Sequence, residues 1–142
     1  MFLGKELGAR PDDPTCYENG RVDFGRLAER KEFKSGLERV LQGCEKYRIA
    51  LMCAEKEPLG CHRTILVCRI LKRPAVIIKH ILPDGTLEDH RDAEYRLIKL
   101  FNCEQDLFSY DVSDDARLEC AYNKRASEIA YSGGNRTGGF YD

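Results

Sequence analysis

Hydrophobic side chains recur along much of the chain at intervals of three and four, the spacing of one helical face. This pattern predicts a helix from Asp23, whose side chain can cap it, and a longer helix over residues 31–47. Further helices are predicted from Asp89 onward and over residues 114–130. The chain is therefore expected to be rich in helices.

Two short apolar runs interrupt the helical spacing and are typical of strands. Residues 48–53 are continuously apolar after Arg48, and residues 75–81 are rich in β-branched side chains. Between them, residues 61–72 are apolar around most of a helix, which predicts a buried helix. This order predicts an α/β fold, a small mostly parallel sheet flanked by helices, with a right-handed βαβ unit at residues 48–81.

The length of 142 residues suits one core of ordinary size. We expect a single α/β domain over residues 1–131 and a disordered Gly-rich tail over residues 132–142. No run approaches the roughly 20 apolar residues that a membrane span requires, and no secretory signal follows Met1. A soluble, cytoplasmic protein without membrane contact is expected.

The charge balance bears on the expected binding partners, and the cysteine content bears on the redox state of the thiols. The chain has 24 acidic against 23 basic residues, and binding along nucleic acid needs an excess of Lys and Arg, so nucleic acid is a disfavoured partner. Seven cysteines are an odd number, and several fall in helical or strand-like patterns. This is typical of reduced thiols, and packing is the expected role of Cys44, Cys68, Cys103 and Cys120.

The segment from Cys53 to Arg63 carries the candidate chemistry, because a predicted strand ends there and a helix begins. Ligands bind at such strand ends, and a helix start attracts anions. We expect the helix start to lower the pKa of Cys61, with help from His62 and Arg63. The candidate catalytic residues are Cys53, Cys61, His62 and Arg63, and the candidate ligand-binding residues are Glu55, Arg63 and Arg10.

Each of these side chains also has a structural interpretation. Cys53 could be a small buried hydrophobic residue that closes a strand. Cys61 and His62 could simply hydrogen-bond the loop, and Arg63 could pair with Glu55 or Glu57 and hold the loop shut. Both interpretations stay open at this point.

The spacing of the candidate residues can be compared with that of two known kinds of site, the cysteine phosphatase site and the zinc site. Cysteine phosphatases place an Arg after five intervening residues, whereas nine residues separate Cys53 from Arg63. A zinc site made of Cys53, Cys61 and His62 lacks a second close ligand pair, so neither a metal nor another cofactor is expected. The remaining histidines, His80 and His90, are interpreted as structural.

The run from Ala50 to Arg63, followed by Lys79 to Gly85, resembles the family catalogued as domain of unknown function 488. The family hallmark is a Cys-Ala-Glu segment, a Pro, a Cys-His-Arg triplet, and then a strand that ends in His-Ile before a Gly turn. The opening Leu3–Gly8 segment is also similar. This resemblance implies an α/β fold and a cytoplasmic prokaryotic protein, and it implies no particular reaction.

Family members usually carry a further strand, a helix and a second strand upstream of the segment that matches Phe2. The resemblance therefore implies either an N-terminally truncated chain or a sheet that closes in a different way. Loss of a strand beside residues 48–53 would expose a sheet edge, through which we expect a homodimer.

These observations favour an enzyme with a thiol-containing, anion-binding pocket that acts on a small phosphorylated or nucleotide-like ligand. One alternative is a non-catalytic module that binds a partner or a nucleic-acid end through Arg63 and nearby lysines. A structural zinc site is the other alternative.

Overall fold

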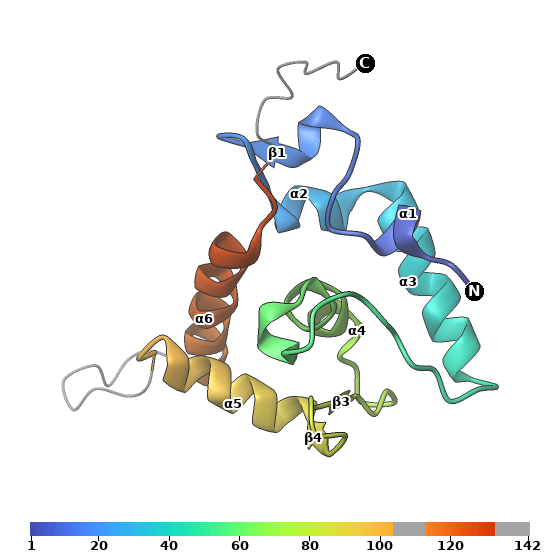
Figure 1. Ribbon diagram of the computed structural model, residues 1–142, viewed down its shortest axis with the longest axis vertical. Helices are drawn as coiled ribbons and strands as arrows, with labels where there is room; N and C mark the ends of the chain where they lie inside the picture. Colours follow the sequence, from blue (N-terminus) through green and yellow to red (C-terminus); the bar gives the residue numbers. More distant parts are fainter. Residues whose placement is uncertain (104–112, 133–142) are drawn as a thin grey trace, which may run out of the picture.

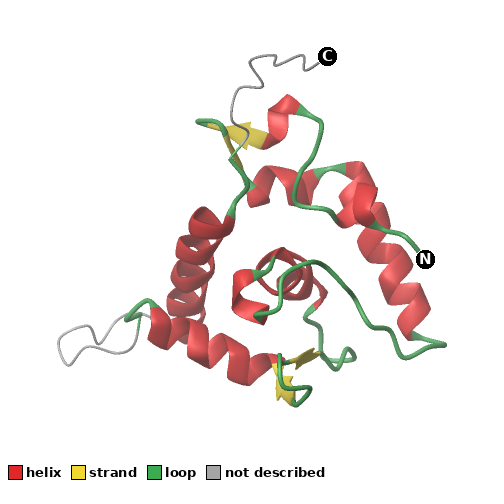
Figure 2. Cartoon of the chain, viewed as in Figure 1, coloured by secondary structure: helices red, strands yellow, loops and turns green. Residues whose placement is uncertain are grey.

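The computed structural model describes residues 1–103 and 113–132, and most of these residues are helical (Figures 1 and 2). The α-helices are α1 (Gly4–Leu7), α2 (Phe24–Glu29), α3 (Lys31–Cys44), α4 (Arg69–Leu71), α5 (His90–Leu100) and α6 (Asp114–Ile129). Two 3₁₀ turns, η1 (Pro14–Cys16) and η2 (Pro58–Gly60), and a π-helical segment, η3 (Arg63–Cys68), complete the helical elements of the described residues.

Two short antiparallel strand pairs accompany the helices. Strand β1 (Tyr17–Glu18) pairs with β2 (Arg21–Val22), and β3 (Lys79–Ile81) pairs with β4 (Leu87–Asp89). Asn19 and Gly20 join β1 to β2 with φ angles of 48° and 77°. An Asn-Gly pair adopts this left-handed backbone readily, so it suits a tight turn between the two strands.

The predicted mostly parallel sheet is wrong. Among the described residues, the strands form only the two antiparallel pairs, and residues 48–53 form no strand. Within 75–81 only the last three residues form a strand, and they pair with the next segment of chain. The βαβ unit at residues 48–81 is therefore absent.

The physical reason is that an apolar run specifies burial but supplies no neighbouring strand for its backbone hydrogen bonds. Ile49 and Leu51 pack against the core, whereas Met52 is 89% exposed. The run thus covers one side of the core as an extended loop. The sheet edge expected at residues 48–53 is not seen in the described part of the chain, and a homodimer stays a prediction.

The helices of the sequence prediction are confirmed, with shifts of a few residues at their ends. The segment η3–α4 lies in the middle of the molecule, seen end-on in Figure 1, with α5 and α6 on one side and α2 and α3 on the other. Five consecutive residues of η3, Thr64–Cys68, are buried. An apolar circumference predicted this central position, because a helix that is apolar on all sides must be covered on all sides.

The core forms where the inward faces of the helices meet the central helix. Leu27, Phe33, Ile65 and Leu97 are among its most completely buried side chains. No helix among the described residues has the length and apolar character needed to cross a bilayer. The tail predicted to be disordered, residues 132–142, lies outside the described residues except for residue 132. The disordered tail and the C-terminal limit of the single domain therefore stay predictions.

Candidate functional site

The candidate site forms where the extended loop after α3 meets the start of the central helix. Pro58 begins the turn η2, and the Glu57 carboxylate accepts a hydrogen bond from the Leu59 amide. This turn folds the chain back, so that Cys61 lies beside Cys53, with their Sγ atoms 2.7 Å apart. We call Cys53, Cys61, His62 and Arg63 the thiol cluster.

Arg63 joins the two parts of the site. Its Nε donates to Cys61 Sγ at 3.2 Å, and its two terminal nitrogens donate to the carbonyl oxygens of Leu51 at 2.8 Å and Glu55 at 2.9 Å. The Arg63 backbone amide also donates to Cys61 Sγ at 3.3 Å. Arg63 thus holds the loop against the helix start through backbone carbonyls, and not through the carboxylates that the sequence suggested.

Burial dominates the electrostatics of Cys61. Its exposed fraction is 0%, and burial, followed by the hydrogen bond with Cys53, raises the pKa of its thiol, while Arg63 opposes this shift. The prediction of a lowered pKa for Cys61 is therefore wrong. The reason is that removing a thiolate from water costs more than the hydrogen bonds of Arg63 return.

His62 lies next to this thiol, with Nδ1 at 3.9 Å from Cys61 Sγ. Burial and the positive charge of Arg63 lower the pKa of His62. The imidazole is therefore neutral at pH 7, so it can accept a proton or bind a metal, and it does not supply the positive charge that the sequence analysis considered.

Cys53 is the accessible member of the cluster, because its side chain is half-buried whereas Cys61 is sealed. The Glu55 amide donates to Cys53 Sγ at 3.3 Å, so Glu55 contributes its backbone to the site. The structure does not bring Arg10 to the cluster, since its guanidinium lies 4.6 Å from the ring centre of Tyr131. The ligand atoms of Cys53, Cys61 and His62 lie within 4.8 Å of one another.

A buried pair of imidazoles lies beneath this site. His80 Nε2 and His90 Nδ1 are 2.9 Å apart, and Thr64 Oγ1 lies 3.5 Å from His80 Nδ1. Burial lowers the pKa of His80 to about 4 and also lowers the pKa of His90. Both imidazoles are therefore neutral at pH 7.

The same chain of contacts continues to a buried carboxylate. The Tyr122 hydroxyl lies 3.3 Å from His90 Nε2 and donates to Glu94 Oε1 at 3.0 Å. Lys72 Nζ reaches Glu94 at 2.7 Å. We call these side chains the histidine network: Thr64, Lys72, His80, His90, Glu94 and Tyr122.

Sequence reasoning identified the two histidines as structural but missed the network that joins them. One signal was present: His90, Glu94 and Leu97 recur at intervals of four and three, so they share one helical face with the core. A charged residue on an inward face indicates a buried polar partner.

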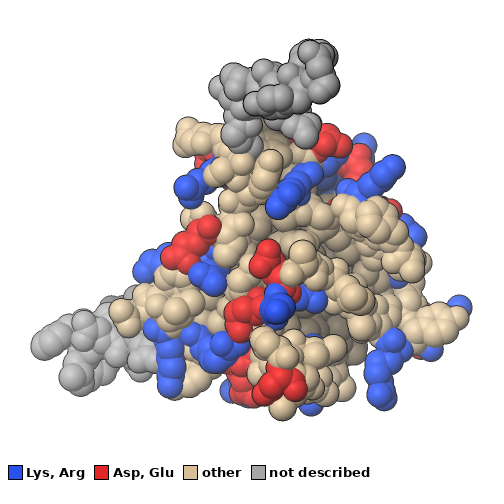
Figure 3. All heavy atoms as spheres, in the orientation of Figure 1, with Lys and Arg blue, Asp and Glu red and all other residues tan. Residues whose placement is uncertain are grey.

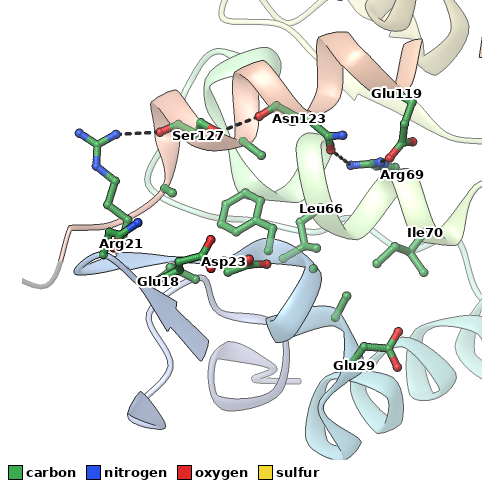
Figure 4. A pocket seen from close by; sticks show the side chains of 17 residues that line it. Glu18, Arg21, Asp23, Glu29, Leu66, Arg69, Ile70, Glu119, Asn123 and Ser127 are labelled. Carbon is green, nitrogen blue, oxygen red and sulfur yellow. Dashed lines mark hydrogen bonds and ion pairs between the residues drawn. The ribbon is translucent and has the colours of Figure 1, made fainter. Parts of the chain in front are cut away.

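The cavity drawn in Figure 4 lies away from the thiol cluster, between the β1–β2 turn, α2, the central helix and α6. Its volume is about 630 Å³, and Leu66 and Ile70 contribute to its apolar wall. Arg69 contacts Glu119 and Asn123 across it, and Arg21 donates to the Ser127 carbonyl. On the face shown in Figure 3, basic and acidic side chains are interspersed.

The fold and site define a mostly helical protein with two short strand pairs and a cluster of two thiols, an imidazole and a guanidinium. A comparison with protein families matches residues 3–70, just under half of the chain, to the family described as Domain of unknown function DUF488, which supports the assignment to that family. The match includes the whole segment from Cys-Ala-Glu to Cys-His-Arg, which confirms the family predicted from these motifs. Comparisons with curated proteins and with solved structures found no match.

Proposed function

We propose that the protein is a thiol-dependent enzyme in which Cys53 attacks a small anionic ligand, phosphorylated or nucleotide-like. The observation that carries this proposal is the 2.7 Å distance between the sulfurs of Cys53 and Cys61. Burial keeps the proton on Cys61, and its S–H group can then donate to Cys53 Sγ. The Glu55 amide donates to the same sulfur, and both donors stabilise negative charge on Cys53.

Arg63 supports the binding of an anion beside Cys53. A guanidinium has five N–H donors, and three of them make the contacts with Leu51, Glu55 and Cys61. The other two can hold a phosphate or carboxylate oxygen. The neutral imidazole of His62 can accept a proton during the reaction and return it.

The experiment compares alkylation by iodoacetate, which is anionic, with alkylation by iodoacetamide, which is neutral. Rates are measured residue by residue by peptide mass spectrometry on the full chain, between about pH 5 and about pH 9. Cys44, exposed at the end of α3, is the internal control. We expect Cys53 to be alkylated faster than Cys44, with an iodoacetate-to-iodoacetamide rate ratio about ten-fold above that of Cys44.

An Arg63→Lys variant tests the origin of this preference, because it keeps the charge and loses the planar array of donors. We expect the ratio at Cys53 to fall toward that of Cys44. If Cys53 reacts no faster than Cys44 and shows the same ratio, the enzyme proposal fails and a non-catalytic binding module is favoured.

The geometry also favours a second candidate, a zinc site. The three ligand atoms of Cys53, Cys61 and His62 lie within 4.8 Å of one another, and zinc sites with three protein ligands keep a fourth position open. Elemental analysis of the purified chain is expected to give about one zinc per chain in this case. That zinc would be lost in Cys61→Ser and kept in a Cys103→Ser/Cys120→Ser variant. Less than about a tenth of an equivalent in the unmodified chain would rule the zinc site out.

A further inference from the structure

The thiol cluster has the geometry of a reversible disulfide. Its two sulfurs are 2.7 Å apart, and a disulfide bond is about 2.05 Å long, so a shift of about 0.7 Å would join them. Both residues are free cysteines. Cys61 is fixed by burial and by its two hydrogen bonds from Arg63, whereas Cys53 lies on an extended loop that forms no strand. The accessible sulfur thus belongs to the loop, and the sealed sulfur belongs to the start of the central helix.

The other cysteines lack this arrangement. Cys103 and Cys120 are the next sulfur pair, at 3.7 Å, and burial and the contact with Cys120 raise the pKa of Cys103. Cys68 is buried, and burial raises the pKa of its thiol to about 12. Cys16 is also buried, and Cys44 is exposed on α3. Cys53 and Cys61 are therefore the pair of sulfurs best placed to close a disulfide.

We propose that peroxide closes a Cys53–Cys61 disulfide that switches the thiol cluster off, and that a thiol reductant opens it again. This inference deepens the proposed function, on which it rests for the nucleophilic role of Cys53. In the oxidised state, Cys53 has no thiolate with which to attack a ligand, and it is protected from irreversible oxidation.

The oxidation proceeds in two steps. The Cys53 thiolate attacks one oxygen of hydrogen peroxide, the O–O bond breaks, and the leaving hydroxide takes a proton from solvent to form water, which leaves Cys53 as a sulfenic acid. The Cys61 sulfur then attacks the Cys53 sulfur, which lies 2.7 Å away, and the S–O bond breaks. The departing hydroxide takes the proton of the Cys61 thiol, so a second water leaves.

Reduction needs an external thiol compound. A dithiol, or two monothiols, gives up two electrons and two protons to the disulfide by thiol–disulfide exchange and is itself oxidised to a disulfide. Cys53 and Cys61 return to the free state. The accessible sulfur of Cys53 is the point at which the reductant attacks, since Cys61 is sealed.

The test uses trypsin and the chain as it exists. Cleavage after Arg48, Lys56 and Arg63 places Cys53 in peptide 49–56 and Cys61 in peptide 57–63. After one equivalent of hydrogen peroxide and blocking of the remaining thiols, we expect these two peptides to be cross-linked, and dithiothreitol to release them. A Cys44→Ser/Cys103→Ser/Cys120→Ser variant is the matched control, and it should form the same cross-link.

A second measurement uses Cys61→Ser, which removes the resolving thiol. After peroxide, dithiothreitol should restore about ten-fold less alkylatable Cys53 than in the unmodified chain, because the sulfenic acid proceeds to sulfinic acid. The inference is overturned if peptides 49–56 and 57–63 stay separate while Cys103 and Cys120 become linked. The peptide mapping needs no substitution, so a folding defect in the variant cannot obscure this result.

The inference and the proposed function can fail separately. If Cys53 is alkylated rapidly and prefers iodoacetate, but peroxide does not link Cys53 to Cys61, the disulfide switch is wrong and the enzyme proposal stands. If the two cysteines are linked but Cys53 is alkylated no faster than Cys44, the enzyme proposal is wrong and the redox-active pair stands.

Discussion

The thiol cluster and the histidine network are adjacent polar groups that differ in their access to water. In the network, Thr64, His80, His90, Glu94 and Tyr122 are all buried, and each has a hydrogen-bond partner. In the thiol cluster, one sulfur is sealed and the other is half-buried. A buried network whose polar groups are all hydrogen-bonded stabilises and specifies a core, whereas a thiol pair with one partly accessible sulfur is available for chemistry. Access to water, more than polarity, therefore separates a polar cluster that stabilises the core from one that can carry chemistry.

Replacing Arg63 with Ala should produce the largest effect on stability. Arg63 belongs to the thiol cluster and directly precedes Thr64 of the histidine network, so this change tests the point where the two clusters meet. The change removes side-chain hydrogen bonds to Leu51, Glu55 and Cys61. We expect the free energy of unfolding to fall by about 2–3 kcal/mol in urea denaturation, because two carbonyls lose their side-chain donor and the Cys61 sulfur keeps only the backbone amide of residue 63. The control is Ala at the exposed Arg91 of α5, and an equal, small loss in both variants would contradict the role of Arg63 as a clamp.

The network should determine how stability depends on pH. The pKa of His80 is lowered to about 4 and that of His90 is also lowered, so below pH 6.5 the unfolded chain binds more protons than the folded chain. The free energy of unfolding should therefore fall by about 2 kcal/mol as the pH falls from about 6.5 toward about 4.

His80→Asn should flatten this part of the pH profile, since it removes the most strongly shifted imidazole. Urea denaturation at several pH values measures it. A variant whose profile matches that of the unmodified chain would show that the acid sensitivity comes from the carboxylates.

Cys53→Ser should have the smallest effect on stability, and it tests whether the thiol cluster, unlike the histidine network, serves chemistry more than stability. Cys53 is half-buried and lies on a loop, so its replacement should change the free energy of unfolding by less than about 0.5 kcal/mol. Alkylation at pH 7 should nevertheless lose its fastest reacting site. A loss of stability comparable to that of Arg63→Ala would mean that Cys53 has a packing role.

Much of the helical structure followed from the sequence because helical periodicity is a local property. The helices α3, α5 and α6 have apolar faces that repeat every three to four residues, and each lies near its predicted position. The conformation of residues 48–53, which form a loop and not the predicted strand, was not predictable in the same way. An apolar run can be buried as a strand or as an extended loop, and the choice depends on a neighbouring strand elsewhere in the chain.

The sequence predicted which residues form the candidate site better than it predicted their chemical properties. The spacing of Cys53, Cys61, His62 and Arg63 brought these residues to attention, and the fold places them together. The direction of the pKa shift at Cys61 was missed, because burial is not visible in sequence. The expected role of Arg10 was not supported by proximity, since it contacts Tyr131.

The sequence by itself determined which segments are helical and which side chains could carry thiol chemistry. Only the tertiary structure decided that the apolar runs make no parallel sheet, that His80 and His90 meet, and that Cys61 is sealed while Cys53 is open. The physical reason is range: periodicity and turn preferences act over a few residues, whereas strand pairing, burial and pKa shifts depend on residues distant in the chain.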